Sequence, residues 1–209
     1  MYPENYHMDI VQNTPEWHDI KRGKVSASRV KDVMAGGKGV TRNNYLSRIV
    51  CEILTGTTED GFSNSNMERG LELEPIARQT YEFFSGNQVD QCGFIDHPFI
   101  PRFGCSPDGL VGDDGMIEIK TVIPSTHLGY IEEGEAPSVY LKQMQSQMAC
   151  SGRQWVDFVS YCPEMPVHLQ LFVKRVIRDE SEIKEIQAEV IAFNNQVDAK
   201  LKMLEEYSL

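Results

Sequence analysis

The sequence predicts a single α/β domain in which helices cover a mixed β-sheet. Its 209 residues suit one large domain, and a chain of this length buries enough surface to fold without disulfides or a structural metal. Apolar residues recur at helical spacing up to about residue 86, mostly at strand spacing from there to about residue 177, and again at helical spacing beyond residue 180. The resulting order of helices, strands, helix, strands and helix is typical of a sheet with helices packed against it.

The N-terminal part, residues 1–86, is predicted to be helical. The expected helices cover residues 26–34, 45–54 and 67–84. Gly56 follows the second of them, where glycine is a common helix C-cap. Gly70 and Pro75 lie inside the third pattern, so we expect a break or a new first turn there.

Residues 87–177 are predicted to form the sheet, and residues 180–207 a C-terminal helix. Strands are expected over residues 89–96, 103–110, 116–122, 155–161 and 167–176. The sequence from Gly112 to Gly115 is a strong hairpin turn between the second and third of these strands. Pro137 suits the first position of a helix that Gly152 ends. All of these elements are expected to belong to one domain.

The composition restricts the function classes. The net charge of −11 argues against non-specific adhesion to nucleic acids or acidic membranes, although a local basic groove can coexist with an acidic exterior. The five cysteines are widely spread without a C-x-x-C pair, so we expect reduced and mostly buried thiols. The N-terminus lacks the basic and apolar regions of a secretory signal, and no apolar run is long enough to span a membrane. We therefore expect a cytoplasmic protein.

The hairpin around residues 112–115 carries the most informative charges. Side chains alternate along a strand, so Glu118 and Lys120 share one face while the residues between and beside them point to the other. A turn at Asp113 and Asp114 places Asp108 opposite residue 119, give or take one, so its carboxylate can approach that of Glu118. Alternatively, these are solvated side chains of a surface hairpin.

Paired carboxylates beside a lysine suit metal-assisted hydrolysis of a phosphodiester. The carboxylates repel one another, and a hard divalent cation relieves this by accepting their oxygens. A lysine beside that ion can hold or deprotonate the attacking water, or offset charge that develops on the phosphate.

Several blocks of sequence resemble one nuclease family. Asp108 followed by Glu118, Ile119 and Lys120 resembles the PD-(D/E)XK signature. Its setting from Cys105 to Leu110 resembles the lambda-exonuclease and YqaJ-type viral recombination nucleases. Three further blocks match in the same order: Trp17 to Ser28, Gly70 to Glu74, and Tyr140 to Gln145. The resemblance runs from Trp17 to about Tyr161 and implies a restriction-endonuclease-like fold.

The resemblance implies roles in catalysis. Asp108, Glu118 and the main-chain carbonyl of Ile119 correspond to magnesium ligands, and Lys120 to the residue that positions water. Glu74 corresponds to a further acidic member near a second metal, but it also suits a helix N-terminus. Gln143 corresponds to a residue that orients Lys120 or the substrate, but a polar residue on an amphipathic helix needs no function. The implied cofactor is Mg²⁺, two ions per site, with Mn²⁺ as an alternative.

The resemblance also implies a pocket for the 5′-phosphate of a DNA end. Ser28, Ser106 and the Lys21-Arg22 pair occupy the matching positions. The family has an arginine at the position of Lys21, so which of the two basic residues meets the phosphate stays open, because lysine lacks the bidentate fork of arginine. Ser28 also suits a helix N-cap.

Three further DNA contacts are implied more weakly. Lys38 matches a basic loop residue that touches duplex DNA, although a lysine in a glycine-rich loop is usually only solvated. Met67 and Trp17 match apolar wedges against the terminal base pair, while core packing is the alternative for Trp17.

The function implied by the resemblance is a magnesium-dependent exonuclease that degrades the 5′-phosphorylated strand of duplex DNA processively and leaves a 3′ single strand for recombination. Its implied partners are duplex DNA ends, two further copies in a ring-shaped homotrimer, and a single-strand annealing recombinase of the same phage or prophage. The alternatives are an endonuclease of the same fold, and a DNA-binding subunit without catalysis, against which the intact Asp108, Glu118 and Lys120 argue.

Overall fold

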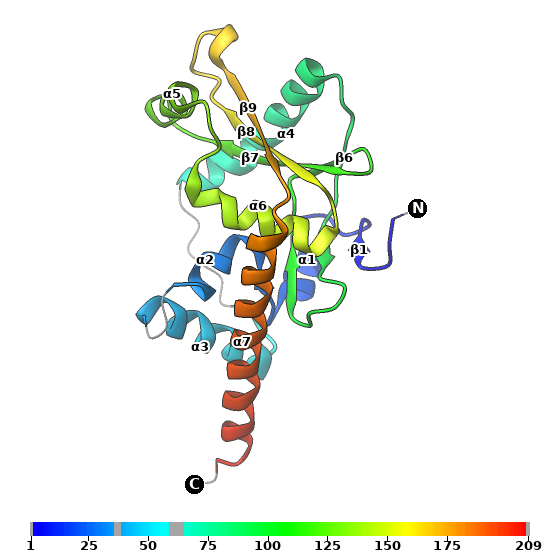
Figure 1. Ribbon diagram of the computed structural model, residues 1–209, viewed down its shortest axis with the longest axis vertical. Helices are drawn as coiled ribbons and strands as arrows, with labels where there is room; N and C mark the ends of the chain where they lie inside the picture. The colour runs from blue at the N-terminus through cyan, green and yellow to red at the C-terminus, as the bar shows by residue number, and fades with distance from the viewer. Residues whose placement is uncertain (1, 36–38, 59–64, 208–209) are drawn as a thin grey trace.

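Two mixed β-sheets lie at the centre of the fold, and the predicted α/β class is confirmed. The computed structural model describes residues 2–35, 39–58 and 65–207, with the side chains of 65–67 excluded (Figure 1). Within these residues, the larger sheet has the order β3 (Val89–Asp90), β6 (Gly109–Val111), β7 (Gly115–Thr121), β8 (Trp155–Tyr161) and β9 (Leu171–Ile177). The smaller sheet has the order β1 (Tyr6–His7), β4 (Phe94–Asp96), β5 (Phe103–Cys105) and β2 (Val25–Ser26).

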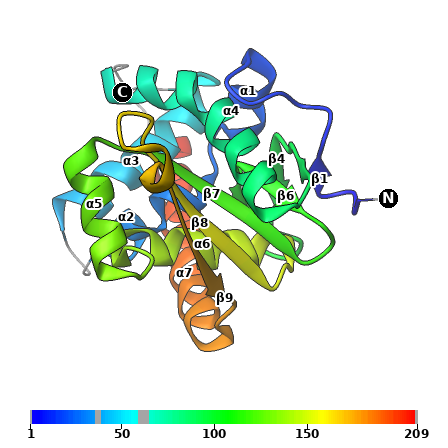
Figure 2. The ribbon, with the colours of Figure 1, turned by 90° about the horizontal axis from the view of Figure 1, so that it is seen from above.

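Helices cover both faces of the larger sheet. The helices are α1 (Pro15–Lys21), α2 (Val30–Val33), α3 (Val40–Thr55), α4 (Ser65–Ser85), α5 (Pro124–Glu133), α6 (Ser138–Ser151) and α7 (Glu180–Glu205), with 3-10 turns η1 (Ala27–Arg29) and η2 (Val167–Leu169). Seen from above, α4 lies on one side of the strands β7 to β9, and α6 and α7 lie on the other (Figure 2). The strand β7 is therefore enclosed between α4 and α6.

Two of the predicted strands are each divided between the sheets. The segment predicted as one strand over residues 103–110 forms β5 in the small sheet and β6 in the large one. Pro107 lies at the division, where the missing N–H of proline prevents a continuous ladder. The segment predicted over residues 89–96 divides into β3 and β4 around Gly93, whose added Cβ would lie 2.2 Å from the carbonyl oxygen of Ile10. The prediction of one sheet missed this second sheet.

The helical part contains further differences. The sequence missed α1, which begins at Pro15 after the N-cap Thr14, and α5, which begins at Pro124. The predicted first helix is a 3-10 turn followed by the four residues of α2. The expected break in the third helix is wrong, because α4 continues through Pro75. Pro75 and Leu71 are both exposed, so water can reach the carbonyl that loses its helical partner.

The C-terminal elements follow the predictions more closely. Gly56 and Gly152 end α3 and α6 in the left-handed conformation, while Pro137 is the N-cap of α6 rather than its first residue. The predicted last strand begins at Leu171, because residues 167–169 form η2.

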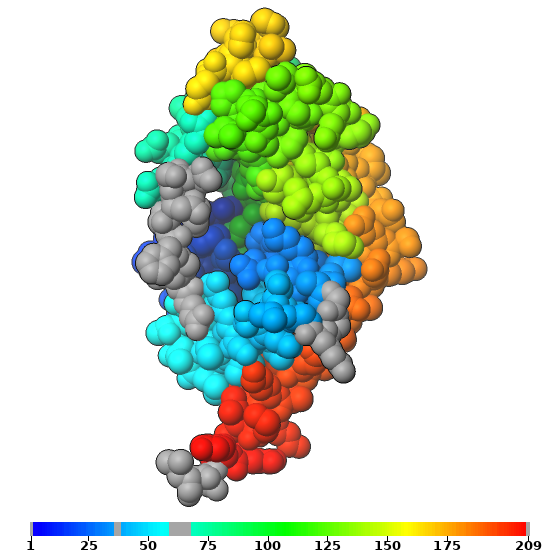
Figure 3. Space-filling model, turned by 90° about the vertical axis from the view of Figure 1, so that its left-hand side faces the viewer, coloured from blue at the N-terminus to red at the C-terminus, as the bar shows by residue number. Residues whose placement is uncertain are grey.

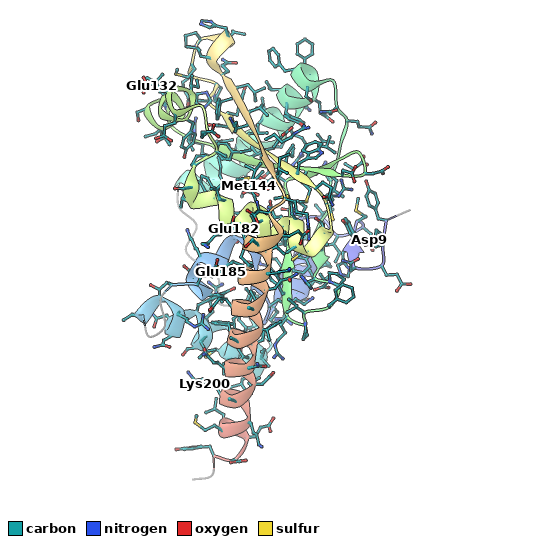
Figure 4. The ribbon with its side chains drawn as sticks, in the orientation of Figure 1. Asp9, Glu132, Met144, Glu182, Glu185 and Lys200 are labelled. Atoms are coloured by element: carbon teal, nitrogen blue, oxygen red, sulfur yellow. The ribbon has the colours of Figure 1, made fainter. Side chains whose placement is uncertain are left out.

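The long helix α7 is fixed to both α6 and α3. Its apolar stripe, from Ile183 to Val197, is buried in the main core together with Met144 of α6 (Figure 4). At the edge of this core, Lys142 of α6 pairs with Glu182 of α7 at 4.0 Å. Further along, Lys200 donates to Ser47 of α3 at 2.9 Å. Helix α6 is therefore packed against α7.

The other composition-based expectations can be compared with the structure. Cys51 is exposed and the other four cysteines are buried, all as free thiols. None of the described helices combines the length and the apolar composition that a membrane crossing needs.

Replacing Gly104 of β5 by alanine is expected to destabilise the fold by about 1–3 kcal/mol, the usual cost of overpacking. An added Cβ would lie 2.3 Å from Cζ of Phe94 and 2.8 Å from the carbonyl oxygen of Ile95. Urea denaturation measures the change. The control is Gly129→Ala in α5, where nothing lies within 4 Å and the helix gains about 0.5–1 kcal/mol. Equal stability of the two variants would contradict the packing described.

Candidate active site

A cavity of about 390 Å³ opens beside the end of β7. It is lined by Asn13, Gly70, Leu71, Glu74, Asp108, Ile119, Lys120, Thr121, Val122 and Tyr140. The corresponding face of the molecule is hollowed between α4 in teal, the blue N-terminal segment and the light green α5 and α6 (Figure 3). Segments far apart in the sequence therefore meet around the residues predicted for catalysis.

The strand β7 offers a free edge at this cavity. Gly109 pairs with Ile117, so β6 begins where β7 still has four residues to run. This register places Asp108 opposite Glu118, within the predicted range. On the free edge, the amide of Ile119 donates to Oδ2 of Asp108 at 2.6 Å. Because the N–H and C=O of one strand residue project to the same side, the carbonyl of Ile119 lies on this edge too.

The two faces of β7 separate apolar from polar chemistry, as the alternation predicted. Ile117 and Ile119 pack with Ala77 and Tyr81 of α4. Glu118 points to the opposite face, where it is buried against α6 and only 1% exposed.

Glu118 accepts hydrogen bonds from three side chains. Its Oε1 accepts from the ammonium of Lys120 and from Nε2 of Gln143 at 2.6 Å. Its Oε2 accepts from Nε2 of Gln147 at 2.5 Å. A buried carboxylate needs such hydrogen-bond donors, so α6 fixes the position of Glu118.

Lys120 is an ammonium group between carboxylates and an aromatic ring. Its Nζ lies 5.0 Å from the ring centroid of Tyr140. Burial alone lowers the pKa of this lysine, but the charges of Glu118 and Asp108 outweigh burial and raise the pKa above its ordinary value. In the metal-free protein Lys120 is therefore a permanent cation and hydrogen-bond donor, which favours holding water or offsetting charge over removing a proton.

Glu74 of α4 joins the site from the other side. Its Oε1 accepts from Nη2 of Arg78 at 2.5 Å, and Nε of the same arginine donates to the carbonyl oxygen of Asp108 at 3.1 Å. Burial raises the pKa of Glu74, Arg78 lowers it, and the charge of Glu118 raises it again. Arg78 thus ties the helix carboxylate to the residue that precedes the hairpin.

The donor set fits a hard divalent cation that keeps much of its water. Within the described part of the chain, no three His, Cys, Asp or Glu side chains are grouped closely enough to hold a metal. Two carboxylates and the carbonyl of Ile119 remain, and Mg²⁺ is commonly bound through one or two carboxylates and several waters. Burial, and then the charges of Glu118 and Glu74, raise the pKa of Asp108 well above its usual range. A cation at this edge relieves that repulsion.

A second cavity of about 490 Å³ adjoins the first, because Asn13 lines both. It contains Lys21 and Ser28, two of the residues predicted to read a terminal phosphate. Nζ of Lys21 lies 3.3 Å from the ring centroid of Trp17. The indole Nε1 of Trp17 donates to Oγ of Ser106 and to the carbonyl oxygen of Gly93, both at 2.9 Å. Trp17 therefore connects Lys21 with Ser106, which does not line the cavity itself.

The remaining predicted DNA contacts are placed differently. Arg22 pairs with Asp19 and does not line the second cavity. Ser28 lies inside the turn η1 and bonds Ser26 at 3.1 Å, so the reading of Ser28 as a helix N-cap is wrong. Lys38 lies outside the described residues, and so does the side chain of Met67, whose backbone belongs to α4.

Sequence reasoning missed two residues of the site. Gln147 holds Glu118 together with Gln143, and their spacing of four residues on one helix is a signal that could have revealed it. The motif instead drew attention to Gln145, which bonds the backbone of Ile177 and Asp179. Arg78 lacked such a signal, because its contact with Asp108 joins segments 30 residues apart.

The chain matches known proteins in sequence and in fold. The family model for the YqaJ-like viral recombinase domain matches residues 16–154. A search of curated proteins returned no match.

Among solved structures, the chain is similar to an alkaline exonuclease, LHK-Exo, from Laribacter hongkongensis, with 48% identity and a TM-score of 0.86 over 92% of this chain and 96% of that one. The same exonuclease in complex with dAMP gives 49% identity and a TM-score of 0.87 with the same coverage. A phage-related exonuclease from Haemophilus somnus 129PT, at 14% identity, TM-score 0.68, and 90% and 99% coverage, shares the fold.

The matched segment contains Glu74, Asp108, Glu118 and Lys120. It also contains every residue that lines either cavity except Asn13, and it covers more than half of the chain. The chain therefore belongs to the YqaJ-like viral recombinase family.

Proposed function

We propose that this protein is a metal-dependent nuclease that removes nucleotides from the 5′ ends of double-stranded DNA. The observation that carries the proposal is the junction of two cavities at Asn13. The first cavity holds Glu74, Asp108 and Lys120. The second, the cationic cavity, holds positively charged side chains that suit a terminal phosphate. A strand whose 5′-phosphate enters the cationic cavity extends its first phosphodiester towards the carboxylates.

The residues of the chain support hydrolysis at that position. Asp108, Glu118 and the carbonyl of Ile119 would hold Mg²⁺ or Mn²⁺, with Glu74 beside a second ion. A bound ion supplies Lewis-acid activation of the phosphodiester and neutralises charge on the attacked phosphate. The ammonium of Lys120 donates hydrogen bonds towards the water and offsets negative charge that develops in the transition state. Gln143 and Gln147 keep Glu118 in place during this step.

The relatives support the same class of reaction. LHK-Exo is an alkaline exonuclease whose complex with dAMP contains a nucleoside monophosphate, which is the size of a single released residue. Family resemblance further supports processive digestion by a ring-shaped homotrimer in the cytoplasm of a bacterial host, with an annealing recombinase as partner for the 3′ single strand. An acidic exterior with a net charge of −11 is compatible with this arrangement, since it keeps DNA away from surfaces other than the cationic cavity.

Digestion of linear and covalently closed circular duplex, with and without Mg²⁺, tests the proposal. We expect the linear duplex alone to be degraded, and only with the metal. Cleavage of the circle would favour an endonuclease of the same fold. Absence of cleavage with Mg²⁺ and with Mn²⁺ would leave a DNA-binding subunit without catalysis.

The preference for 5′-phosphorylated ends is expected to fall as the pH rises through about 8. Burial, and then the neighbouring Arg48, lower the pKa of Lys21 to about 8. Lys21 is charged below this pH and neutral above it, while the terminal phosphate stays anionic throughout. The measurement is the ratio of kcat/KM for 5′-phosphate and 5′-hydroxyl ends from pH 6.5 to 9.5, because kcat/KM reports the free enzyme. Taking the ratio cancels the pH dependence of the hydrolysis step.

The control for this profile is Lys21→Arg, whose guanidinium stays charged throughout the range. We expect its ratio to remain level with pH. A ratio that does not change with pH in the wild-type protein would show that Lys21 does not contact the phosphate.

A further inference from the structure

The cationic cavity contains an arginine that the sequence did not single out. The full lining is Asn13, Trp17, His18, Lys21, Lys24, Ser26, Ser28, Arg29, Tyr45, Arg48, Ile49, Glu52 and Thr58. Lys24 and Arg29 are paired with Asp96 at 2.6 Å and with Asp32 at 2.5 Å. Arg48 belongs to α3, and Lys21, which lines the same cavity, is the last residue of α1.

Arg48 and Lys21 bring two positive charges to one cavity. The charge of Arg48 is the second cause, after burial, of the lowered pKa of Lys21, so the two groups are close enough to repel. Arg48 is partly exposed, with 34% of its side chain accessible. Two neighbouring cations in a partly buried cavity are stabilised by an anion that contacts both.

One buried carboxylate organises both cations. Oε1 of Glu52 accepts from Nε of Arg48 at 2.9 Å, and Oε2 accepts from the amide of Gly23 at 3.0 Å. Glu52 is 5% exposed. Gly23 has a φ of +68°, and a Cβ there would lie 2.7 Å from Cγ1 of Ile53, so the chain after Lys21 packs directly on α3. Glu52 thus fixes the turn that follows one cation and the side chain of the other.

We propose that Arg48 is a second reader of the 5′-terminal phosphate, with Lys21 as the first and Glu52 as the positioning residue for both. This inference rests on the proposed function. Lysine offers a point charge, whereas the planar guanidinium binds two phosphate oxygens at once. Arg48 supplies this bidentate contact from α3. Arg22, the next residue in the sequence after Lys21, does not line the cavity.

The test compares kcat/KM on 5′-phosphate and 5′-hydroxyl ends for Arg48→Met, Arg48→Lys and Lys24→Met at pH 7. Arg48→Met removes the hydrogen bonds between the guanidinium and the charged phosphate. We therefore expect the preference for 5′-phosphate ends to fall by about 10- to 100-fold in this variant. A smaller loss is expected in Arg48→Lys, which keeps the charge but not the fork. Lys24→Met removes a charge from the same cavity but leaves the contacts of Glu52 with Arg48 and with the turn after Lys21 intact, so the preference is expected to remain. Hydrolysis of 5′-hydroxyl ends controls for an intact catalytic site.

The pH dependence of the preference separates recognition of the phosphate by Arg48 from a purely structural role of this residue. Without the charge of Arg48, the pKa of Lys21 moves upward, so the alkaline fall in preference is expected above pH 8 in Arg48→Met. Glu52→Gln is expected to weaken the preference for 5′-phosphate ends, because the side chain of Arg48 and the turn after Lys21 lose the carboxylate that fixes them. Thermal unfolding identifies any variant that fails to fold, and Arg48→Lys then carries the comparison.

The possible failures are distinguishable. A wild-type protein that treats phosphate and hydroxyl ends alike overturns the reading of the 5′ end in the proposed function. A wild-type preference that persists in both Arg48 variants overturns the role of Arg48 alone. An equal loss in Lys24→Met also overturns it, because general charge in the cavity then explains the effect.

Discussion

Lys120→Ala is expected to reduce cleavage of duplex DNA by about 10²- to 10⁴-fold, the contribution typical of a positioned proton-transfer or charge-stabilising group. The variant removes the ammonium that lies between Glu118 and the ring of Tyr140. Glu118 retains its bonds from Gln143 and Gln147, so the carboxylate is expected to stay in place. The measurement is single-turnover cleavage with Mg²⁺ in excess, beside DNA binding by fluorescence anisotropy with Ca²⁺.

The matched control is Lys174→Ala, which removes a lysine paired with Glu135 on the surface. We expect wild-type cleavage in this control. Binding retained with cleavage lost supports the role of Lys120, whereas cleavage near the wild-type rate excludes the lysine from the mechanism. Loss of binding together with cleavage would assign Lys120 to substrate affinity instead.

Asp108→Asn is expected to abolish metal-dependent cleavage and to stabilise the metal-free protein. Asparagine keeps an oxygen that can accept from the amide of Ile119, so the geometry of the edge is preserved. Burial and the charge of Glu118 raise the pKa of Asp108, which means that the folded state disfavours its charged form. At neutral pH the variant removes this cost, and below about pH 4, where the aspartate is protonated in both states, the advantage disappears.

Thermal unfolding with and without Mg²⁺ measures both effects. A metal at 100 times its dissociation constant stabilises a protein by about 2.7 kcal/mol, and each kcal/mol shifts the midpoint by about 2–4 °C at this size. We expect this gain in the wild-type protein and its loss in Asp108→Asn. The conservative control is Ser106→Ala, two residues away, which leaves both carboxylates unchanged. An equal gain in wild type and Asp108→Asn would exclude Asp108 as a ligand.

The sequence predicted the hairpin of the candidate site because its signals are local. Alternation places Glu118 and Lys120 on one face of β7, and the turn at Gly112 fixes the register that brings Asp108 opposite Glu118. A strand and a tight turn each depend on residues that are neighbours in sequence or across one ladder. The resemblance to the nuclease family is confirmed by the family model over residues 16–154 and by the 48% identity to an alkaline exonuclease.

The rest of the site depends on contacts that only the fold creates. Arg78 reaches Asp108 from α4, and Arg48 and Lys21 line the same second cavity. Neither pair has a fixed spacing that a pattern could reveal. The division of one predicted strand at Pro107 shows the same limit, because its two halves join different sheets. A polar spacing on a helix, as for Gln147, is an intermediate case that helical periodicity could have found.

The central claim is that the site on the free edge of β7 removes nucleotides from a 5′-phosphorylated end. The most direct measurement uses a linear duplex with a 5′-phosphate on one strand only and separate labels at the 5′ and 3′ ends of that strand. With Mg²⁺, we expect the 5′ label to be released first as a mononucleotide, the 3′ label last, and the complementary strand to remain whole. Early release of the 3′ label, or internal fragments before any mononucleotide, would contradict the account.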